Sequence, residues 1–497
     1  MNLPHTQTPP VTTRRPLDRA ALPAPVLDAE PELIDLYWAA WELAYDHVVT
    51  REGAPRSPYM DEGFDPDTIW IWDTCFMAHF CKYAPDLFPG VESFDNFYRP
   101  MYDAEPTTLR IHHPDNPPLF AWSEEEYVRH TGDLDRVRWL LRDKAYLQQH
   151  FAFMEATPAG SRFPHSNIAT TVQRVPRGYL WEGVTSGMDN TPRAPIQGEH
   201  GTSGDILWFD VAAQQALSAR SIARLARLIG ADELAAEYDG HHARLVALVN
   251  DFWSAEHGSY FDRFAEEPYD FHRVRTPAVY WPLLAGACDA AQADALAAAL
   301  ADPKCFGGPV PWPSVARDDP EFRPDGMYWR GGVWIPVAYA SARALADSGH
   351  QDLAHRASLD LIRHMARTWS SYSPATIWEA YSPTLPAPST AKDDRTPVRP
   401  DFCGWSALAP ISMLIEHILG FRVDALTRTV HYRRYLPGRT GIRNLRCGDT
   451  RVTMVADDTT LTVETDGPIT LSLPDRDIPL TPGHHTLYGL FHDSLES

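Results

Sequence analysis

The sequence lacks the patterns of membrane proteins and of nucleic-acid-binding proteins. It contains no run of about 18 apolar residues, the length that a membrane-spanning helix needs. Residues 1–32 are polar and proline-rich, without the apolar stretch that a secretory signal requires. Lys and Arg number 44 against 66 Asp and Glu, and the net charge of −22 leaves no basic stripe for phosphates. We therefore expect a cytoplasmic protein that binds neither nucleic acid nor membrane.

The sequence also has few groups that could hold a metal ion or a cofactor. Its 6 cysteines are scattered, and only Cys75 and Cys81 lie close together, without a second pair at zinc-ligand spacing. Several of the 21 histidines form adjacent pairs, which do not face the same way on a helix or strand. Neither a G-x-S-x-G nucleophile elbow nor a phosphate-binding loop is present. The sequence therefore predicts reduced thiols and no metal or cofactor.

Apolar residues recur with helical spacing through most of the chain. From Leu33 onward they follow an i, i+3/i+4, i+7 pattern, and about twelve helical segments precede Gly420. We expect these segments to start near residues 31, 72, 93, 119, 133, 206, 231, 277, 288, 332, 349 and 404. Several are paired across a hinge in which glycine ends one helix and a short polar residue follows: Gly132, Gly230, Gly286 and Gly349. Such pairs are αα-hairpins.

Two helical architectures accommodate these hairpins, a closed (α/α)6 barrel and an open α-solenoid. A solenoid needs a fixed repeat of about 34 to 47 residues, whereas the hinges are irregularly spaced. After Gly420 the pattern changes, and segments such as 451–455 and 460–464 alternate as half-buried antiparallel strands do. The predicted fold is mainly α: a flexible tail (1–25), an (α/α)6 barrel (26–420) and a small C-terminal antiparallel β-domain (421–497).

Two acidic residues lie in aromatic-rich loops that are far apart in the chain. Asp189 lies in the turn SGMDNTPR (186–193), and Glu379 lies in WEAYSP (378–383). Glycoside hydrolysis needs two carboxyl groups, because one protonates the leaving oxygen while the other activates water. Each residue taken alone also fits an ordinary structural role, Asp189 in an Asx-type turn and Glu379 as an exposed loop glutamate.

Two further clusters have the composition of a sugar-binding rim. Trp72 and Asp73 could grip a ring face and hydroxyl groups, although Asp73 could equally cap the helix that begins there. The segment YWRGGVW (328–334) combines a fork-shaped arginine donor with aromatic side chains and two glycines. That segment could instead be a helix N-terminus with a buried ion pair.

Together these segments resemble the motifs of the inverting (α/α)6-barrel glycoside hydrolases. This family-63-like clan contains trehalase, the N-glycan processing α-glucosidase and bacterial mannosylglycerate hydrolase. The resemblance covers most of residues 65–425, and several motifs occur in the same order as in the clan. The matching segments are WIWD (70–73), NPPLFAW (116–122), SGMDNTPR (186–193), YWRGGVW (328–334), WEAYSP (378–383) and FCGWS (402–406).

The resemblance implies a role for each matching residue. Asp189 would be the general acid and Glu379 the general base. Asp73, Trp329 and Arg330 would line the −1 subsite, with Arg193 near the acid. The full set of implied substrate-binding residues is Trp72, Asp73, Trp122, Arg193, Tyr328, Trp329, Arg330, Trp378, Tyr381 and Trp405.

Three positions depart from the motifs of the clan. Asn116 stands where glutamine is usual, Gly332 where proline is usual and Ser382 where asparagine is usual. Because these positions lie beside the expected pocket, they bear on the identity of the substrate more than on catalysis. The large N-terminal β-domain of the processing glucosidases has no counterpart in this sequence, which favours a compact bacterial member.

We therefore expect an exo-acting, inverting α-glycosidase, of the α-glucosidase or α-mannosidase type, that hydrolyses a small glycoside or oligosaccharide. The alternatives are a non-catalytic carbohydrate-binding protein on the same barrel and an (α/α)6 lyase or epimerase. A lyase usually needs a basic subsite for uronates, which the net charge of −22 disfavours. The expected partner is the small carbohydrate substrate, and the sequence leaves a monomer and a homo-oligomer both open.

Overall fold

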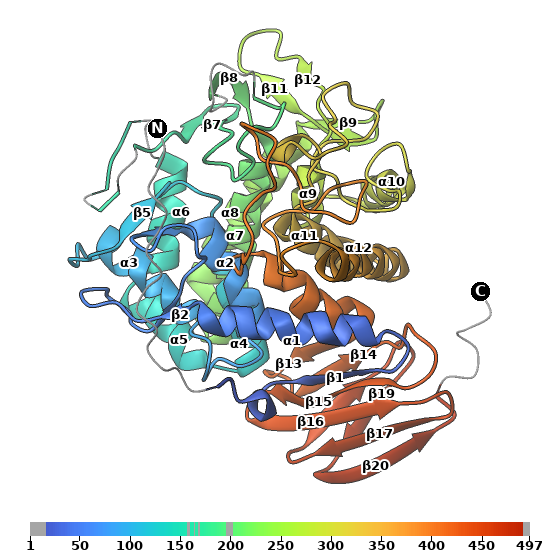
Figure 1. The fold of residues 1–497 in the computed structure, drawn as a ribbon. Coiled ribbons are helices and arrows are strands. Elements are labelled where there is room, and N and C mark those ends of the chain that lie inside the picture. The colour runs from blue at the N-terminus through green and yellow to red at the C-terminus, as the bar shows by residue number, and fades with distance from the viewer. Residues whose placement is uncertain (1–15, 157–159, 164, 167–168, 195–201, 491–497) are drawn as a thin grey trace.

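The computed structural model describes residues 16–156, 160–163, 165–166, 169–194 and 202–490, and it contains the predicted barrel. Helices alternate between an outer and an inner ring along the chain (Figure 1). The outer ring comprises α1 (Pro31–Asp46), α3 (Asp95–Tyr102), α6 (Tyr146–Ala156), α8 (Asp232–Asn250), α10 (Ala290–Ala301) and α12 (Gln351–Ser371). The inner ring comprises α2 (Ile71–Cys81), α4 (Phe120–Thr131), α7 (Phe209–Leu228), α9 (Tyr280–Leu284), α11 (Ile335–Asp347) and the π-helix η7 (Ala409–Ile418). Consecutive inner helices contact one another and η7 contacts α2, so the ring is closed.

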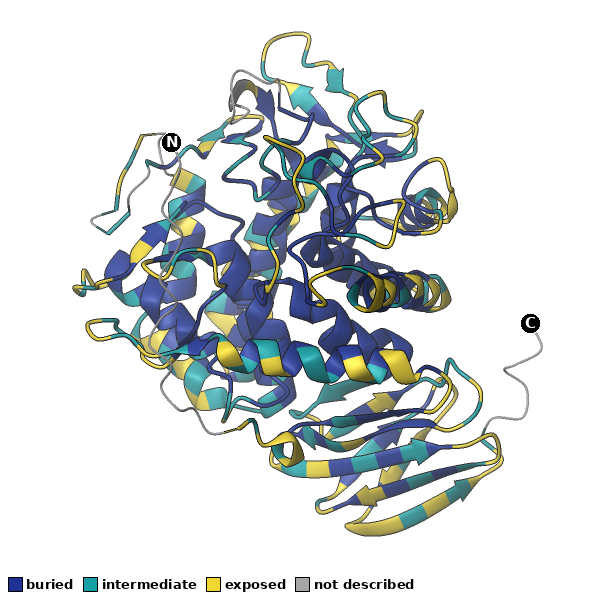
Figure 2. Ribbon diagram, in the orientation of Figure 1, coloured by how far each residue is buried: buried dark blue, intermediate teal, exposed yellow. Residues whose placement is uncertain are grey.

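The two rings differ in how far their residues are buried (Figure 2). Every residue of α2 and of η7 is buried, and most residues of α7 are buried as well. A helix that is surrounded on all sides belongs in the core of a large domain. By contrast, α8 and α12 each bury one face and expose the other, as helices of an outer layer do.

The helix boundaries follow the predicted signals. Gly132 ends α4 at a φ of 78°, in the left-handed region that glycine adopts without strain. The side chain of Asp133 then accepts a hydrogen bond from the amide of Arg136 and begins α5 (Leu134–Arg138). Each predicted helix start has a helical element close to it. The sequence pattern does not predict α6. Glutamine and histidine residues interrupt the apolar residues of this segment, so its helical periodicity is weak.

The β-domain consists of two sheets that lie beyond one end of the barrel (Figure 1). Their strand orders are β1-β15-β16-β17-β20 and β13-β14-β18-β19, and among the described pairs of these sheets only β14 and β18 run parallel. Strand β13 contacts both α4 and η7, so this domain covers the ends at which the inner helices finish. The strands are β13 (Phe421–Asp424), β14 (Thr429–Tyr432), β15 (Thr440–Cys447), β16 (Thr450–Ala456), β17 (Thr460–Thr465), β18 (Ile469–Ser472), β19 (Asp477–Leu480) and β20 (Gly483–Tyr488).

The N-terminal segment differs from the predicted tail at 1–25. Within it, Arg19–Ala21 forms a short 3-10 helix, and β1 (Ala24–Leu27) pairs antiparallel with β15. Residues 24–27 therefore belong to the C-terminal sheet rather than to a tail or to the barrel. A proline is tolerated in this strand because β1 is at the edge of its sheet. Residues 1–15 lie outside the described part of the chain.

Several short strands lie in the connections between helices. One small sheet, ordered β12-β11-β8-β7-β6, lies at the barrel end away from the β-domain (Figure 1). It is formed by β6 (Gln173–Val175), β7 (Gly178–Glu182), β8 (Thr202–Leu207), β11 (Asp262–Phe264) and β12 (Phe271–His272). A parallel pair, β4 (Thr68–Trp70) and β5 (Arg110–His112), leads into α2. These connections supply the loops from which the candidate site is built.

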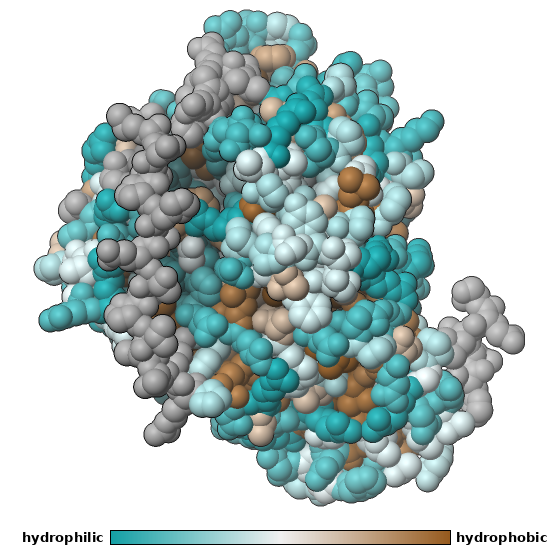
Figure 3. Space-filling view, viewed as in Figure 1, coloured by the Kyte–Doolittle hydropathy of each residue, from teal (hydrophilic) through white to brown (hydrophobic). Residues whose placement is uncertain are grey.

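The face of the molecule in Figure 3 is mostly hydrophilic, and apolar residues form only small patches on it. Within the described ranges, no helix is long and apolar enough to cross a membrane. The six cysteines are free thiols.

A buried carboxylate ties inner helices together near the β-domain. Glu416 on η7 is bound by Lys82 Nζ at 3.1 Å and by Arg343 Nη1 at 2.8 Å. The hydroxyl groups of Tyr83 and Tyr339 also donate to it. Burial opposes ionisation, but Lys82 and Arg343 hold the pKa of Glu416 well below the ordinary 4.5. The charge of Glu416 therefore stabilises the folded state at neutral pH.

We expect Glu416→Gln to lower the free energy of unfolding by about 3 to 5 kcal/mol at pH 7, because it leaves two buried cations, Lys82 and Arg343, with only the Glu126 carboxylate between them. Urea unfolding followed by circular dichroism measures this. The difference from wild type should be complete above pH 4.5 and should shrink as the pH falls further, because the folded-state pKa is depressed. Glu464→Gln, at an exposed position of β17, is the control and should change stability by less than about 0.5 kcal/mol. An equal effect of the two substitutions would contradict the account.

Candidate active site

A cavity of about 630 Å³ lies at the barrel end where the inner helices begin. Trp72 and Asp73 lie in the first turn of α2, and Trp405 directly precedes the 3-10 helix η6 (Ser406–Leu408) and η7. Loops between helices supply the rest of the wall, so the cavity collects motifs that are far apart in the chain. The predicted site residues that line it are Trp72, Asp73, Asp189, Tyr328, Trp329, Glu379 and Trp405.

Asp189 is presented by a tightly packed turn. Gly187, at a φ of 80°, lies against Trp72, and a Cβ there would stand 3.0 Å from the indole ring. Glycine therefore allows the turn to approach α2 closely. Met188 is buried, whereas the Asp189 side chain is 23% exposed and reaches the cavity. Its Oδ2 is 3.0 Å from Nζ of Lys392.

Neighbouring residues lock the turn in place. Asn190 donates from Nδ2 to the Met327 carbonyl at 3.1 Å and accepts at Oδ1 from the Trp329 amide at 2.8 Å. Arg330 Nε donates to the Asn190 carbonyl at 3.2 Å. Behind the turn, the guanidinium of Arg193 binds two further carboxylates. The position of Asp189 is thus fixed from both sides.

Glu379 is buried at the opposite loop and is held by hydrogen bonds. The Tyr328 hydroxyl donates to Oε1 at 2.8 Å, and the Arg399 amide donates to Oε2 at 3.3 Å. The indole of Trp405 donates to the Glu379 carbonyl at 2.8 Å. Burial raises the pKa of Glu379, and the bonds from Tyr328 and Arg399 oppose that rise because they favour the carboxylate.

Acidic side chains are concentrated around the cavity. Burial raises the pKa of Asp73 well above its ordinary value, and the charges of Glu379 and Asp189 add to the effect. Burial also raises the pKa of Asp61 to about 7 and that of Glu62 well above its ordinary value. In the described part of the chain, neither carboxyl oxygen of Glu62 has a hydrogen-bond partner. Sequence reasoning does not predict Asp61 and Glu62, whose only signal is their nearness to the WIWD motif.

The loop between Pro383 and Pro400 forms part of the cavity wall, and its length and position in the long insertion 373–403 are typical of a functional loop. Lys392 and Arg399 come from it, and the Arg399 guanidinium lies 3.7 Å from the centre of the Phe64 ring. Other lining residues outside the predicted set are Phe64, Trp70, His112, His113, Asn116, Val184, Gly187, Ala391, Lys392, Asp393, Pro397, Val398, Arg399 and Pro400. The proline-rich composition of this loop marks it as irregular but does not reveal which way Lys392 points.

Five predicted substrate-binding residues lie outside the lining of this cavity: Trp122, Arg193, Arg330, Trp378 and Tyr381. Trp122 packs inside the barrel with its ring 4.1 Å from that of His79. Arg193 is fully buried, because its guanidinium neutralises Asp210 and Asp262. Arg330 forms an ion pair with Glu321.

Trp378 and Tyr381 flank Glu379 in the segment WEAYSP (378–383). The Trp378 amide donates to the Tyr381 hydroxyl at 3.2 Å, so the two residues brace the backbone on either side of Glu379. Both are buried. These residues therefore hold the loops that carry the lining side chains, and the sequence pattern cannot distinguish such support from contact with a ligand.

The three departures from the clan motifs have local structural reasons. Asn116 donates from Nδ2 to the Thr185 carbonyl at 2.9 Å, next to the segment 186–193 that carries Asp189. The Gly332 amide donates to the carbonyls of Gly326 and Tyr328, each at 3.1 Å, which a proline could not do. Ser382 Oγ accepts hydrogen bonds from the amides of Thr384 and Leu385 and begins the loop that carries Lys392.

Among the described residues, no group of three or more His, Cys, Asp or Glu side chains is arranged to hold a metal ion. The polar groups that line the cavity are carboxyl groups, two histidines, one asparagine, one tyrosine, one lysine and one arginine, and they lie beside tryptophan and phenylalanine rings. Its geometry suits acid–base chemistry on a ligand with hydroxyl groups and flat apolar faces.

Comparison with known proteins places this arrangement among glycoside hydrolases. Residues 72–393 match the model of the mannosylglycerate hydrolase MGH1-like glycoside hydrolase domain. The matched span includes the segment SGMDNTPR (186–193), the segment YWRGGVW (328–334) and Glu379.

Relatives and solved structures agree with this family. A probable mannosyl-oligosaccharide glucosidase of Schizosaccharomyces pombe is 24% identical over 73% of this chain, which spans about half (50%) of that protein. A mannosylglycerate hydrolase of Thermus thermophilus is 37% identical over 119 residues, 23% of this chain and 27% of that protein. The structure of GH63 mannosylglycerate hydrolase from Thermus thermophilus in complex with glucose has a TM-score of 0.54 at 19% identity, covering 76% of this chain and 99% of that one. At this identity the structural likeness supports the fold.

Proposed function

The chain belongs to the mannosylglycerate hydrolase MGH1-like family of glycoside hydrolases, and we propose that it is an exo-acting, inverting α-glycosidase with Asp189 as general acid and Glu379 as general base. The observation that carries the proposal is that these two carboxyl groups, from separate loops, line one cavity. In an inverting reaction the acid protonates the leaving oxygen while the base activates a water on the opposite face of the sugar. An inverting mechanism fits the family.

The surroundings of Glu379 support the role of base. A general base must be ionised before it can accept a proton from water. The Tyr328 hydroxyl and the Arg399 amide donate to its two oxygens and so stabilise the ionised form inside a buried site. These donors also orient the carboxylate, because each oxygen has one fixed partner.

The cavity wall supports a sugar ring as the ligand. Trp72, Trp329 and Trp405 offer apolar surfaces to ring faces, and Asp73 offers a polar group for hydroxyls. A cavity of about 630 Å³ suits a small glycoside. We propose a substrate of the α-glucoside or α-mannoside type.

The ion pair at Asp189 supports a leaving group with a negative charge. Lys392 lines the cavity beside Asp189, with its Nζ 3.0 Å from Oδ2. An anionic aglycone bound next to Asp189 would pair with the Lys392 ammonium through a charge-assisted hydrogen bond. Glycerate is such an aglycone, and mannosylglycerate is the substrate in the names of similar proteins. We propose an α-glycoside of a small carboxylic acid as the substrate.

Removing either carboxylic acid should abolish turnover. We expect Asp189→Asn and Glu379→Gln each to lower kcat by about 10²- to 10⁴-fold on α-mannosylglycerate or α-glucosylglycerate, whichever the wild type hydrolyses. Circular dichroism should show an unchanged fold. Asp135→Asn on α5 and Glu464→Gln on β17 are matched controls at exposed positions and should keep full activity. Near-normal turnover by either active-site variant would overturn the role given to that residue.

Tyr328→Phe should change the pH dependence of the reaction. The hydroxyl favours the ionised form of Glu379, so its loss raises the pKa of Glu379 further. The acidic limb of the kcat/KM profile should therefore move to higher pH, and kcat/KM on that limb should fall by about tenfold or more. Tyr280→Phe is an isosteric control, because its buried hydroxyl donates to the Leu296 carbonyl and Tyr280 does not line the cavity. An acidic limb that stays in place in Tyr328→Phe would show that it reports another group.

Lys392→Gln should lower activity on a negatively charged substrate but not on a neutral one. We expect kcat/KM to fall by about 10- to 100-fold on an α-glycosylglycerate, because a charge-assisted contact to the carboxylate is lost. The matching methyl α-glycoside should be hydrolysed at the wild-type rate or faster, since Asp189 is released from its ion pair. Lys304→Gln, at an exposed position, serves as the control. An equal loss on both substrates would mean that Lys392 positions Asp189 for every leaving group.

A further inference from the structure

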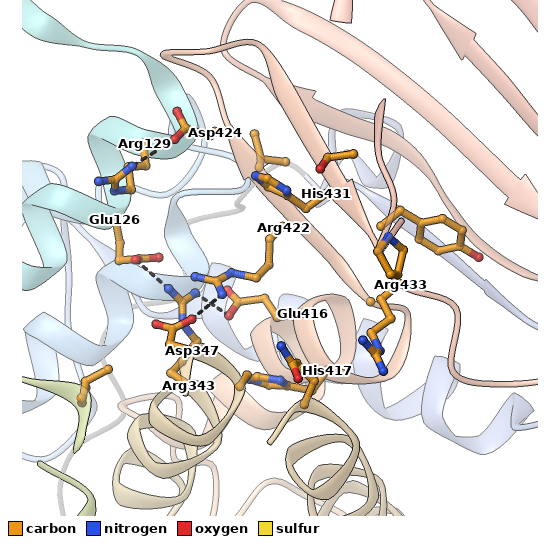
Figure 4. A pocket seen from close by; sticks show the side chains of 18 of the residues that line it. Glu126, Arg129, Arg343, Asp347, Glu416, His417, Arg422, Asp424, His431 and Arg433 are labelled. Carbon is orange, nitrogen blue, oxygen red and sulfur yellow. Dashed lines mark hydrogen bonds and ion pairs between the residues drawn. The ribbon is translucent and has the colours of Figure 1, made fainter. Parts of the chain in front are cut away.

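A second cavity, of about 620 Å³, lies at the other end of the barrel. It is enclosed by the ends of α4, α7, α11 and η7 and by β13 and β14 of the C-terminal domain. Figure 4 shows side chains from the helices and from the strands pointing into the same space. The residues that line it do not overlap with those that line the catalytic cavity.

The charged side chains of this cavity are almost all paired with one another. Six arginines and five carboxylates line it. Figure 4 shows Arg129 beside Asp424, Arg343 between Glu126 and Glu416, and Arg422 beside Asp347. Arg433 binds Asp352 outside the cavity. In the described part of the chain, Arg220 is the arginine of this set for which no carboxylate lies within ion-pair distance.

Arg220 is a largely buried guanidinium with unused hydrogen-bond donors. Its Nη2 donates to the Leu284 carbonyl at 2.6 Å, whereas its buried Nε has no partner among the described residues. Gly286 leaves room beside the remaining nitrogen, because a Cβ there would stand 2.9 Å from Nη1. Burial and the charge of Arg224 lower the pKa of Arg220 to about 10, so it stays charged at neutral pH. A buried cation without a counter-charge is costly unless an anion accompanies it.

Arg220 also lies within a local excess of positive charge. Arg224, one turn along α7, is partly exposed, and its Nη1 donates to Glu125 at 3.2 Å, the one hydrogen bond of its guanidinium within the described residues. Glu125 already binds Arg129 and the Ser221 hydroxyl. Asp424 on Arg129 is the only other carboxylate paired with these three arginines in the described residues. These three guanidinium groups therefore share two carboxylates, because Glu126 and Glu416 are already matched by Lys82 and Arg343. This local excess of positive charge occurs in a protein whose net charge is −22.

We propose that this cavity is a binding site for a small oxyanion-bearing ligand, whose phosphate or carboxylate group is held by Arg220 and Arg224. Guanidinium groups bind both kinds of oxyanion through paired N–H donors. The volume of about 620 Å³ has room for a sugar-sized body behind the charged group. This site is independent of the proposed catalytic roles.

Calorimetric titration of the full-length protein with inorganic phosphate and with acetate tests the proposal. Each ion represents one source of the charge, and tighter binding of one identifies the group that the ligand carries. The better ion should bind at least tenfold more weakly to Arg220→Gln and to Arg224→Gln. Arg227→Gln is the matched control, because Arg227 lies on the same helix but pairs with Asp239 on the surface.

Two further comparisons show which cavity binds the ion and whether a loss of binding is a loss of folding. Lys392→Gln should bind the ion as the wild type does, which distinguishes this cavity from the catalytic one. Arg224→Gln changes a partly exposed side chain, so it reports binding even if Arg220→Gln fails to fold. Absence of binding by both ions, or equal affinity in the wild type and in Arg224→Gln, would overturn the proposal.

Discussion

The turn at Met327–Arg330 joins the two loops that carry the proposed catalytic carboxyl groups. Its backbone binds both polar ends of the Asn190 amide, next to Asp189, while the Tyr328 hydroxyl binds Glu379. The stacked rings of Trp329 and Trp334, 4.2 Å apart, support this turn at the start of α11. Because one segment holds both groups, their separation is set by the turn at Met327–Arg330 rather than by two independent loops. Precise positioning of this kind is what acid–base catalysis requires.

The two ends of the inner ring differ in their electrostatics. Helix N-termini carry partial positive charge and C-termini carry partial negative charge. The carboxyl groups of the catalytic cavity lie at the end where α2, α11 and η7 begin, and the arginines of the second cavity lie where inner helices finish. The ring therefore favours acids at one mouth and cations at the other. In the second cavity the β-domain adds one carboxylate, Asp424, and two arginines, Arg422 and Arg433, and Arg220 remains without an ion-pair partner among the described residues.

The sequence was sufficient to predict the barrel because its signals are local. Gly132 marks a helix end by its left-handed backbone, and the periodic apolar residues of α7 and α11 mark buried helices. Trp72, Asp73, Tyr328 and Trp329 line the cavity, and their contact with a substrate stays a prediction. Position in a motif does not reveal side-chain direction, however, so Arg193 and Trp122 could not be separated from ligand contacts. The position of Lys392 beside Asp189 and the pairing of β1 with β15 both depend on contacts between distant parts of the chain. No local sequence pattern encodes such contacts.

The central claim is that Asp189 and Glu379 act on opposite faces of the sugar in a single displacement. Proton NMR during the first minutes of hydrolysis of an α-linked substrate tests it most directly, because the anomer released first records the stereochemistry before mutarotation. The account predicts that the β-anomer appears first. An α-anomer released first would show retention through a covalent intermediate and would contradict the roles assigned to both residues.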